Sequence, residues 1–260
     1  MSLKGKVCVV TGSSMGIGQA IAAKFLKEGA TVILNSRKQE RVDNGVAEFK
    51  EAGYENVDGY AFDVTNKARL EEVADDIVKK YGHVDVLVNN SGINAIGPSY
   101  DLPEEDYLRV LRTNLAGAFF ASQVFGKKMR GKGGAIVMID SVFGSVCTGG
   151  RAAYSSSKGG MLALTKVLGV EWARDGIRVN SVAPGYVKTN LDELDQESGG
   201  YTDADICGRT PLGRYATPEE IANVVAFVAS DEASYLVGEN INVDGGWVAF
   251  GGWSTKPIDG

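Results

Sequence analysis

Histidine and cysteine are scarce in this chain of 260 residues, which has one histidine, His83, and three cysteines, Cys8, Cys147 and Cys207. Because the cysteines are odd in number and widely separated, we expect neither a disulfide framework nor a zinc site, and a reducing cytoplasm fits. The lone histidine, expected at the surface, leaves a Ser-His-Asp hydrolase without its base. We interpret the acidic residues within 192–205 as a solvated rim, so no metal site is predicted.

Excess positive charge and long apolar runs are also missing. The chain has 27 Lys and Arg against 33 Asp and Glu, a formal net charge of −6, whereas a nucleic-acid partner requires a basic face. No apolar run approaches the roughly 20 residues of a membrane span. The first residues lead directly into a strand-like run, with no secretory signal pattern. We therefore expect a cytoplasmic protein that binds neither nucleic acid nor a membrane.

Glycine is abundant, with 34 residues, and strand-like and helix-like segments alternate throughout. The strand-like runs are 6–12, 30–37, 57–64, 84–92, 134–141, 177–185 and 240–246. The helical segments are 16–29, a charged stretch to about 51, 67–81, 103–129, 152–174 and 218–230. Apolar strands that are each followed by a helix predict a parallel sheet covered on both faces. The predicted fold class is α/β, a doubly wound (Rossmann-type) sheet in a single domain over residues 1–260.

The least regular stretch is 186–217, which is rich in acidic residues and glycine. It is longer than an ordinary connection between elements. Because ligands of this fold lie at the carboxyl ends of the strands, this stretch is predicted to form a lid over the substrate. A solvated surface excursion is the alternative.

The sequence TGSSMGIG, residues 11–18, joins the first strand to the first helix. Gly12 permits a tight turn, Gly16 permits close approach of a pyrophosphate, and Gly18 permits the helix to pack closely on the strand. The helix N-terminus offers free N–H groups to the phosphates. The spacing differs from the common G-x-G-x-x-G fingerprint, but its position between strand and helix favours a dinucleotide site.

Basic residues follow the second strand, where NAD-binding proteins usually carry an acid for the adenosine ribose. The sequence there is LNSRKQE, with no acid before Glu40. Arg37 is suited to bind a 2′-phosphate, and Lys38 adds a second positive charge. We therefore favour NADP over NAD, although Met15 stands where many NADP enzymes with this turn have a basic residue.

The next two strands also end in polar residues. Asp63 is suited to accept a hydrogen bond from the adenine amino group, and Asn89 and Asn90 are predicted to fix the backbone near the two riboses.

Tyr154 and Lys158 are four residues apart in AAYSSSKGG, so on a helix they share a face. A free tyrosine has a pKa of about 10. A neighbouring ammonium that lowers this pKa by about 3 units contributes roughly 4 kcal/mol, which requires partial exclusion of water. The small residues around the pair leave room for the flat ring of a cofactor. The pair therefore predicts proton transfer, unless it is an ordinary surface pair on an amphipathic helix.

Two further polar residues fit this chemistry. Ser141 ends the fifth strand and is suited to bind a substrate carbonyl, and Asn114 precedes it on a helix and is suited to hold a water linked to Lys158.

Together these motifs resemble the short-chain dehydrogenase/reductase family, in its compact single-domain branch. TGSSMGIG, NNSG, Asn114, Ser141, YSSSK and APG occur in the family's order and spacing over nearly the whole chain. The resemblance implies that Tyr154 is the acid/base, Ser141 orients the carbonyl, Lys158 lowers the tyrosine pKa and binds the nicotinamide ribose, and Asn114 supports a water relay. Ser91 replaces the usual alanine of NNAG.

The resemblance also implies a cofactor site and an assembly. The expected cofactor residues are Gly12, Ser14, Met15, Gly16, Ile17, Gly18, Ser36, Arg37, Lys38, Asp63, Val64, Asn90, Ser91, Gly92, Tyr154, Lys158, Pro184, Gly185, Val187 and Thr189. A homotetramer is implied, with segment 243–253 near a subunit interface and Trp247 as a packing residue.

The family builds its substrate pocket from segments that here supply a mixture of polar and apolar residues. The expected substrate residues are Asn94, Ser141, Phe143, Arg151, Tyr154 and Tyr186, with Ile96, Val142 and Cys147 as further lining. This mixture suits a sugar, polyol or small cyclic ketone reduced with NADP(H). A 3-ketoacyl-thioester reductase is the alternative enzyme; Asp175 and the acidic lid argue against it because both repel an acidic carrier. A non-catalytic NADP(H)-binding regulator is the alternative of another class.

Overall fold

The fold is built on a sheet of seven parallel strands in the order β3-β2-β1-β4-β5-β6-β7. The structure, a computed structural model, describes residues 2–252. The strands are β1 (Val7–Val10), β2 (Thr31–Ser36), β3 (Val57–Ala61), β4 (Val86–Asn89), β5 (Gly134–Ile139), β6 (Ile177–Pro184) and β7 (Asn240–Val243). Each coincides with a predicted run, so the expected doubly wound α/β fold is confirmed.

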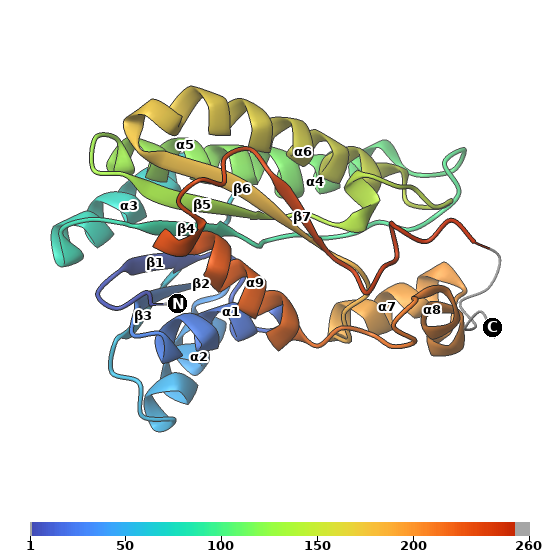
Figure 1. Ribbon diagram of the computed structural model, residues 1–260, viewed down its shortest axis with the longest axis horizontal. Coiled ribbons are helices and arrows are strands. Elements are labelled where there is room, and N and C mark those ends of the chain that lie inside the picture. The colour runs from blue at the N-terminus through green and yellow to red at the C-terminus, as the bar shows by residue number, and fades with distance from the viewer. Residues whose placement is uncertain (1, 253–260) are drawn as a thin grey trace.

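Helices cover both faces of the sheet, as Figure 1 shows. One face carries α1 (Gly16–Lys27), α2 (Gln39–Glu51) and α9 (Pro218–Ala229). The other face carries α3 (Lys67–Tyr81), α4 (Glu104–Leu111), α5 (Gly117–Met129) and α6 (Ala152–Trp172). The inner strands β2, β1, β4, β5 and β6 are buried on both sides because each face is covered, which explains why they read as continuous apolar runs. The edge strands β3 and β7 are mostly half-buried.

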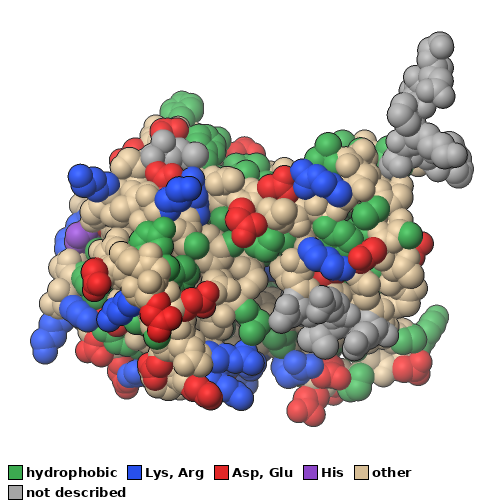
Figure 2. Space-filling view, turned by 90° about the horizontal axis from the view of Figure 1, so that it is seen from below, with side chains coloured by type: hydrophobic (Ala, Val, Ile, Leu, Met, Phe, Trp, Pro, Cys, Tyr) green, Lys and Arg blue, Asp and Glu red, His purple; other side chains and the backbone are tan. Residues whose placement is uncertain are grey.

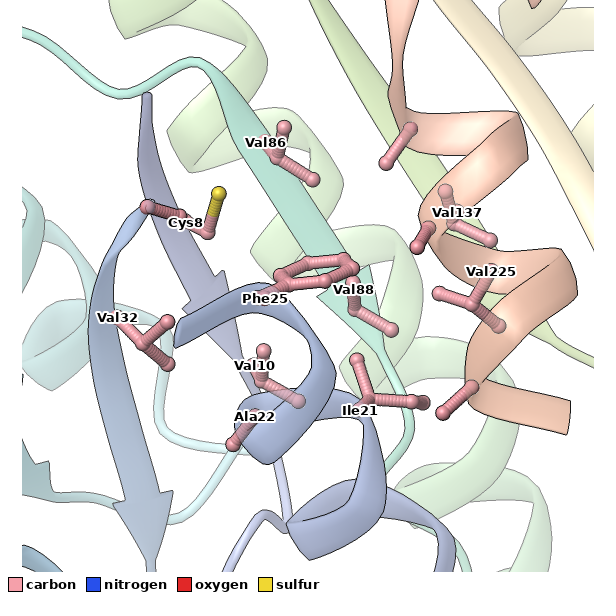
Figure 3. Close-up of a cluster of buried hydrophobic side chains, with 14 of the residues drawn as sticks. Cys8, Val10, Ile21, Ala22, Phe25, Val32, Val86, Val88, Val137 and Val225 are labelled. Atoms are coloured by element: carbon pink, nitrogen blue, oxygen red, sulfur yellow. The ribbon is translucent and has the colours of Figure 1, made fainter. Parts of the chain in front are cut away.

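The apolar core is correspondingly divided between the two faces of the sheet. Figure 3 shows the cluster beneath α1 and α9, where Phe25 and Ile21 of α1 lie against Val10, Val88 and other strand residues. Val225 enters the same cluster from α9. The opposite cluster joins α3, α5 and α6 to the other face of the strands. Because successive strand side chains point to opposite faces, one strand supplies both clusters.

Local signals in the sequence fix several helix ends. Thr217 caps α9 in a capping box, since its hydroxyl accepts from the N–H of Glu220 while the Glu220 carboxylate accepts from the N–H of Thr217. Pro218 follows as the first helical residue, where a missing N–H costs nothing. Helix α3 ends at Gly82, which adopts φ = 85°, a left-handed conformation that favours glycine.

The winding of the sheet reverses between β1 and β4. From β1 the chain proceeds outward through β2 and β3, and it then crosses back to β4 and continues in the other direction. The loops after β1 and β4 therefore diverge and leave a crevice at the carboxyl ends of the strands, which is where ligands bind in this class of fold.

The segment 186–217 is more regular than the sequence suggested. It contains two helices, α7 (Asn190–Gly199) and α8 (Asp203–Arg209), which lie together at one end of the sheet in Figure 1. Thr189 and Thr202 cap these helices, each accepting a backbone N–H three residues later. The high content of Asp, Gly and Thr that resembled a loop thus encodes two short helices and their caps.

The surface carries charge of both signs. Figure 2 shows acidic and basic side chains interspersed over the face that it draws. His83 is at the surface as expected, with 41% of its side chain exposed and its Nε2 2.8 Å from Asp85 Oδ2. Within residues 2–252, no helix has the length and apolar character needed to cross a membrane.

Gly18 is the position where the fold tolerates a side chain least. A Cβ there would lie 2.5 Å from Asn90 Nδ2 and 2.9 Å from Ser13 Cα, and closer still to the Gly12 carbonyl oxygen. We expect Gly18→Ala to lower the free energy of unfolding by about 1–3 kcal/mol, the usual cost of overpacking. Gly208→Ala in α8 is the matched control, because a Cβ there meets nothing within 4 Å. Equal denaturant midpoints for the two variants would contradict this account of the turn.

Candidate active site

A single cleft of about 850 Å³ runs across the carboxyl ends of the strands. Of the expected cofactor residues, all but Lys38 line it. Ser141, Tyr154, Lys158, Phe143, Arg151 and Tyr186 line its other part. The structure therefore brings the predicted cofactor and chemical residues into one continuous cavity.

The turn after β1 presents helix α1 to this cleft. Gly12 and Gly16 have φ values of 62° and 57°, in the left-handed region that glycine adopts without strain. Met15, at the N-cap of α1, makes no side-chain cap hydrogen bond. The N–H groups of the first turn are therefore available to an anion, and their dipoles favour one.

Polar side chains hold this turn against the neighbouring strand ends. Asn90 Nδ2 donates to the carbonyl oxygens of Thr11 and Gly12, at 3.0 and 2.9 Å. Asn35 Oδ1 accepts from the Gly12 N–H at 3.1 Å, and the Asn35 N–H donates to Ser13 Oγ at 2.9 Å. Asn90 thus holds the backbone of the turn after β1, as predicted, and Asn35 holds the same turn through two further hydrogen bonds.

The basic end of the cleft differs from the prediction by one residue. Arg37 lines the cleft beside Ser36, and Arg41 joins them from the first turn of α2. Lys38 was expected to contribute, but it is exposed at the N-cap of α2 and does not line the cleft. Lys38 precedes α2 in an extended conformation, with φ = −108° and ψ = 127°, and neighbouring side chains of an extended segment point to opposite sides, so Lys38 points away from the side that Arg37 faces.

The chemical residues come from two elements. Ser141 follows β5, and Tyr154 and Lys158 lie one turn apart on α6. Lys158 is only 4% exposed, and its Nζ donates to the carbonyl oxygen of Ile139 at 2.6 Å. The same Nζ lies 5.5 Å from the centre of the Tyr154 ring. The predicted shared face of α6 is therefore confirmed.

The pKa of Tyr154 is not lowered in this structure. Burial is the largest effect and raises it, hydrogen bonding by Ser141 lowers it, and the negative charge of Asp140 raises it, for a net value of about 12. The sequence predicted a lowered pKa because of Lys158. Instead the Lys158 ammonium donates to a backbone carbonyl, and its own pKa is lowered by burial. Desolvation of the phenolate outweighs the neighbouring cation here.

Asn114 lies behind the cleft rather than in its wall. It is fully buried in a π-helical turn, Arg112–Ala116, between α4 and α5. Its side chain accepts from the Ile93 N–H and donates to the Ile93 carbonyl, both at 2.9 Å, and it donates to Ser157 Oγ at 3.0 Å. Ser157 Oγ in turn donates to the Tyr154 carbonyl oxygen at 2.7 Å. Asn114 thus joins the segment after β4 to the turn of α6 that carries Tyr154 and Lys158, and its predicted water relay stays a prediction.

In the part of the cleft that Ser141 and Tyr154 line, Arg151 is 5% exposed and forms an ion pair with Asp195 of α7, with Arg151 NH1 2.8 Å from Asp195 Oδ2. Asn94 Nδ2 donates to the same oxygen at 3.0 Å. The guanidinium also lies over the rings of Phe143 and Tyr201, 5.2 and 5.8 Å from their centres. Asn94 therefore contacts α7 rather than lining the cleft.

An aromatic cluster continues this wall. Its centre is Tyr186, whose ring lies 6.0 Å from Phe143, 5.5 Å from Tyr201, 6.3 Å from Tyr215 and 5.0 Å from Trp247, between ring centres. Trp247 packs within its own chain, as a packing residue should. Its expected proximity to a subunit interface stays a prediction, and the end of segment 243–253 lies outside the described residues.

The acidic segment is not simply a solvated rim. Asp192 is 7% exposed and Asp195 pairs with Arg151, and both line the cleft. Burial raises the pKa of Asp192, and hydrogen bonding by Gln196 offsets part of this. The prediction failed because α7 turns one acidic face toward the cavity. Three other expected lining residues, Ile96, Val142 and Cys147, do not line the cleft; Val142 is buried and Cys147 is exposed.

Sequence reasoning missed Asp140, Arg41 and Asp195. Asp140 is 2% exposed and lines the cleft directly before Ser141. A charged residue at the end of an apolar strand run was the available signal for it. Arg41 follows Arg37 by four residues, which was the available signal for it. No local pattern marks Asp195 as the partner of Arg151. Among the side chains that the structure describes, no group of three or more His, Cys, Asp or Glu is placed to bind a metal ion.

The high pKa of Tyr154 predicts how its hydroxyl titrates. In the protein without added nucleotide, we expect no phenolate from Tyr154 below about pH 10, because burial disfavours the charged form. The difference in phenolate absorbance between the wild type and Tyr154→Phe isolates this group from the other tyrosines. An ionisation near neutral pH in that difference would show that Lys158 dominates over burial.

Comparison with known proteins agrees with this geometry. The profile of a family described as Enoyl-(Acyl carrier protein) reductase matches residues 12–248. A 3-oxoacyl-[acyl-carrier-protein] reductase of Thermotoga maritima is 41% identical over 249 residues, which cover 95% of this chain and all of the relative. A tropinone reductase homolog of Arabidopsis thaliana is 37% identical, covering 98% of this chain and 97% of the relative.

Solved structures agree as well. A gluconate 5-dehydrogenase from Burkholderia cenocepacia, in complex with NADP and tartrate, has a TM-score of 0.91 at 31% identity, covering 96% of this chain and 97% of the other. A putative gluconate dehydrogenase from Agrobacterium tumefaciens has the same TM-score at 34% identity, with 96% and 98% coverage. The chain therefore belongs to the short-chain dehydrogenase/reductase family and is an oxidoreductase of the ketoreductase/alcohol dehydrogenase type.

Proposed function

We propose that this protein transfers a hydride between NADP(H) and a secondary alcohol/ketone pair, with a sugar, a polyol or a small cyclic ketone as substrate. One observation carries the proposal: Ser141, Tyr154 and Lys158 line the same cleft as the open N-terminus of α1 and Arg37. A homotetramer in the cytoplasm is part of the proposal.

The residues of the cleft fit a dinucleotide. The uncapped first turn of α1 is suited to the pyrophosphate, because its N–H groups have no side-chain partner. A Cβ built on Gly16 would meet only Thr189 within 4 Å, so this part of the turn faces the cavity. Asp63 lines the adenine end, with Oδ1 accepting from the N–H and hydroxyl of Thr65. When bound, the cofactor would supply or accept the hydride.

The protein residues would then manage the proton. In carbonyl reduction, the Tyr154 hydroxyl donates its proton to the substrate oxygen, which the Ser141 hydroxyl also binds. Ser141 Oγ accepts from the Phe143 N–H at 3.2 Å, which orients the hydroxyl. The raised pKa of Tyr154 keeps this acid protonated at neutral pH. Lys158, held at the end of β5, provides the positive charge that favours phenolate when the proton leaves.

The choice of NADP is supported by two guanidinium groups. Arg37 and Arg41 line the adenosine end of the cleft, where a 2′-phosphate is a charge-assisted partner for both. A relative whose structure contains NADP has the same fold at a TM-score of 0.91.

The substrate class is supported by the wall around Arg151. The ion pair with Asp195 brings donors and acceptors together beside the aromatic ring of Phe143. Hydroxyl groups of a sugar or polyol can both donate to such a carboxylate and accept from such a guanidinium. Two gluconate dehydrogenase structures are among the similar folds.

A 3-ketoacyl-thioester reductase is the second candidate, because a 3-oxoacyl-[acyl-carrier-protein] reductase is 41% identical over 95% of this chain. Charge argues for the first candidate. Asp175 pairs with Arg130, 3.2 Å away, and so neutralises a cation that could attract an acidic carrier, and Asp205 adds negative charge within the lid. A non-catalytic NADP(H)-binding regulator is less well supported, since it would not need the proton-transfer residues.

A substrate panel tests the proposal. We expect oxidation of NADPH with sugars, polyol-derived ketones or small cyclic ketones to exceed that with acetoacetyl thioesters, measured by the loss of NADPH absorbance. Tyr154→Phe should lower turnover by roughly 10²- to 10⁴-fold, the usual contribution of a general acid, while NADPH affinity is retained. Greater activity with the thioesters would favour the second candidate. NADPH binding without turnover on any substrate would favour the regulator.

The nucleotide preference has its own test. We expect Arg37→Ala to weaken NADPH binding roughly 10- to 100-fold and to leave NADH binding unchanged, because only the 2′-phosphate loses a charge-assisted contact. Lys38→Ala is the matched control and should change NADPH affinity by less than about threefold. Equal losses for NADPH and NADH in the Arg37 variant would mean that this side chain does not bind the phosphate.

A further inference from the structure

Asp140 lies between the end of β5 and Ser141, and its side chain is 2% exposed. Its N–H donates to the Val182 carbonyl at 2.8 Å, so the strand geometry continues through it. Ile139 belongs to the core beneath α1 and α9, and Met138 to the core beneath α5 and α6. Because strand side chains alternate, Asp140 points to the α6 side, as Met138 does.

The carboxyl group of Asp140 has no hydrogen-bond partner on either oxygen among the described residues. The Ser141 N–H lowers its pKa without reaching hydrogen-bonding geometry. Gly144 leaves the space for this carboxyl. A Cβ on that glycine would lie 2.9 and 3.1 Å from the two carboxyl oxygens and 3.1 Å from the backbone oxygen of Lys158. A buried carboxyl without donors opposes folding, which suggests that it serves the site rather than stability.

Lys158 is the matching buried cation. Burial lowers its pKa, and Asp140 is the one charge that raises it. Conversely, burial raises the pKa of Asp140 to about 7, and Lys158 is the charge that lowers it. No charged side chain reaches Asp140 and Lys158 from the two neighbouring segments, the turn Val142–Gly144 and the end of β6 at Ser181–Pro184. On the face of α6 that carries Lys158, Tyr154 is the other titratable group.

We propose that Asp140 is a positioning residue that acts through Lys158: its carboxylate is the counter-charge of the buried ammonium and sets the net positive charge presented to Tyr154. No direct ion pair joins the two within the described part of the chain, so they act on each other through the low-dielectric interior. The proposal rests on the proposed function for its effect on turnover, but not for the coupling of the two charges.

The coupling has a direction. As pH rises through about 7, Asp140 ionises and supports the cationic form of Lys158. The same negative charge raises the pKa of Tyr154. Ionised Asp140 therefore keeps both the ammonium and the phenol protonated, which is the state needed to donate a proton to a carbonyl.

Stability measurements test the coupling without a substrate. The folded pKa of Asp140 lies above its unfolded value, so the carboxyl destabilises the fold increasingly as pH rises from about 4 to about 7 and no further above that. Asp140→Asn removes this effect while keeping the volume. Its gain in thermal midpoint over the wild type should therefore grow with pH and level off near pH 7. In a Lys158→Met background, the levelling should move up by about one pH unit or more, because the lost cation no longer favours the carboxylate. If the gain in thermal midpoint stopped growing at the same pH in both backgrounds, the proposal would be overturned.

Turnover provides a second measurement if Lys158→Met is too unstable to compare. For carbonyl reduction, Asp140→Asn should move the alkaline limb of the kcat profile down by roughly one pH unit, since both Tyr154 and Lys158 would lose protons more easily. Asp175→Asn, which removes an acid outside the cleft, is the matched control and should reproduce the wild-type profile. An Asp140→Asn profile that also coincides with the wild type would overturn the proposal. Full turnover in Tyr154→Phe would instead contradict the proposed function, whatever the stability data show.

Discussion

The hydrogen bond from the Lys158 ammonium to the carbonyl oxygen of Ile139 joins helix α6 to the end of β5. Ser141 lies two residues beyond that carbonyl, and Tyr154 lies one turn before the lysine. One buried contact of 2.6 Å therefore sets the separation between the phenol, the hydroxyl and the cation. The packing of α6 on the sheet is largely apolar, and this polar contact, together with the one between Asn114 and Ser157, fixes how far along the strand the helix sits.

The sequence predicted the sheet, the order of its elements and most of the cofactor cleft. These features depend on local patterns: apolar strand runs, helical periodicity, and a glycine turn between the first strand and helix. It also placed Tyr154 and Lys158 on one helical face. All of these follow from spacing along the chain, which a single sequence displays directly.

What the sequence did not predict depends on contacts between distant segments. The pairing of Arg151 with Asp195 joins residues 44 apart, and no local pattern marks it. The pKa of Tyr154 was predicted in the wrong direction because the balance between burial and a neighbouring cation depends on where the ammonium points. Lys38 was misplaced for a simpler reason, since the direction of its side chain depends on the extended conformation of the residue before α2, which the sequence does not display.

The π-helical turn at Arg112–Ala116 has a consequence for how this chain can change in length. A π turn accommodates an extra residue within a helix. The side chains of α5 are therefore rotated about the helix axis by about 100° relative to those of α4, compared with one continuous α-helix. Deleting one residue here would restore regular geometry but rotate one half of the helix relative to the other. Either Val110 or Ala121, both fully buried, would then leave the core. The packing of both α4 and α5 therefore depends on the extra residue of the π turn that orients Asn114. A deletion of this residue would require compensating changes in the core.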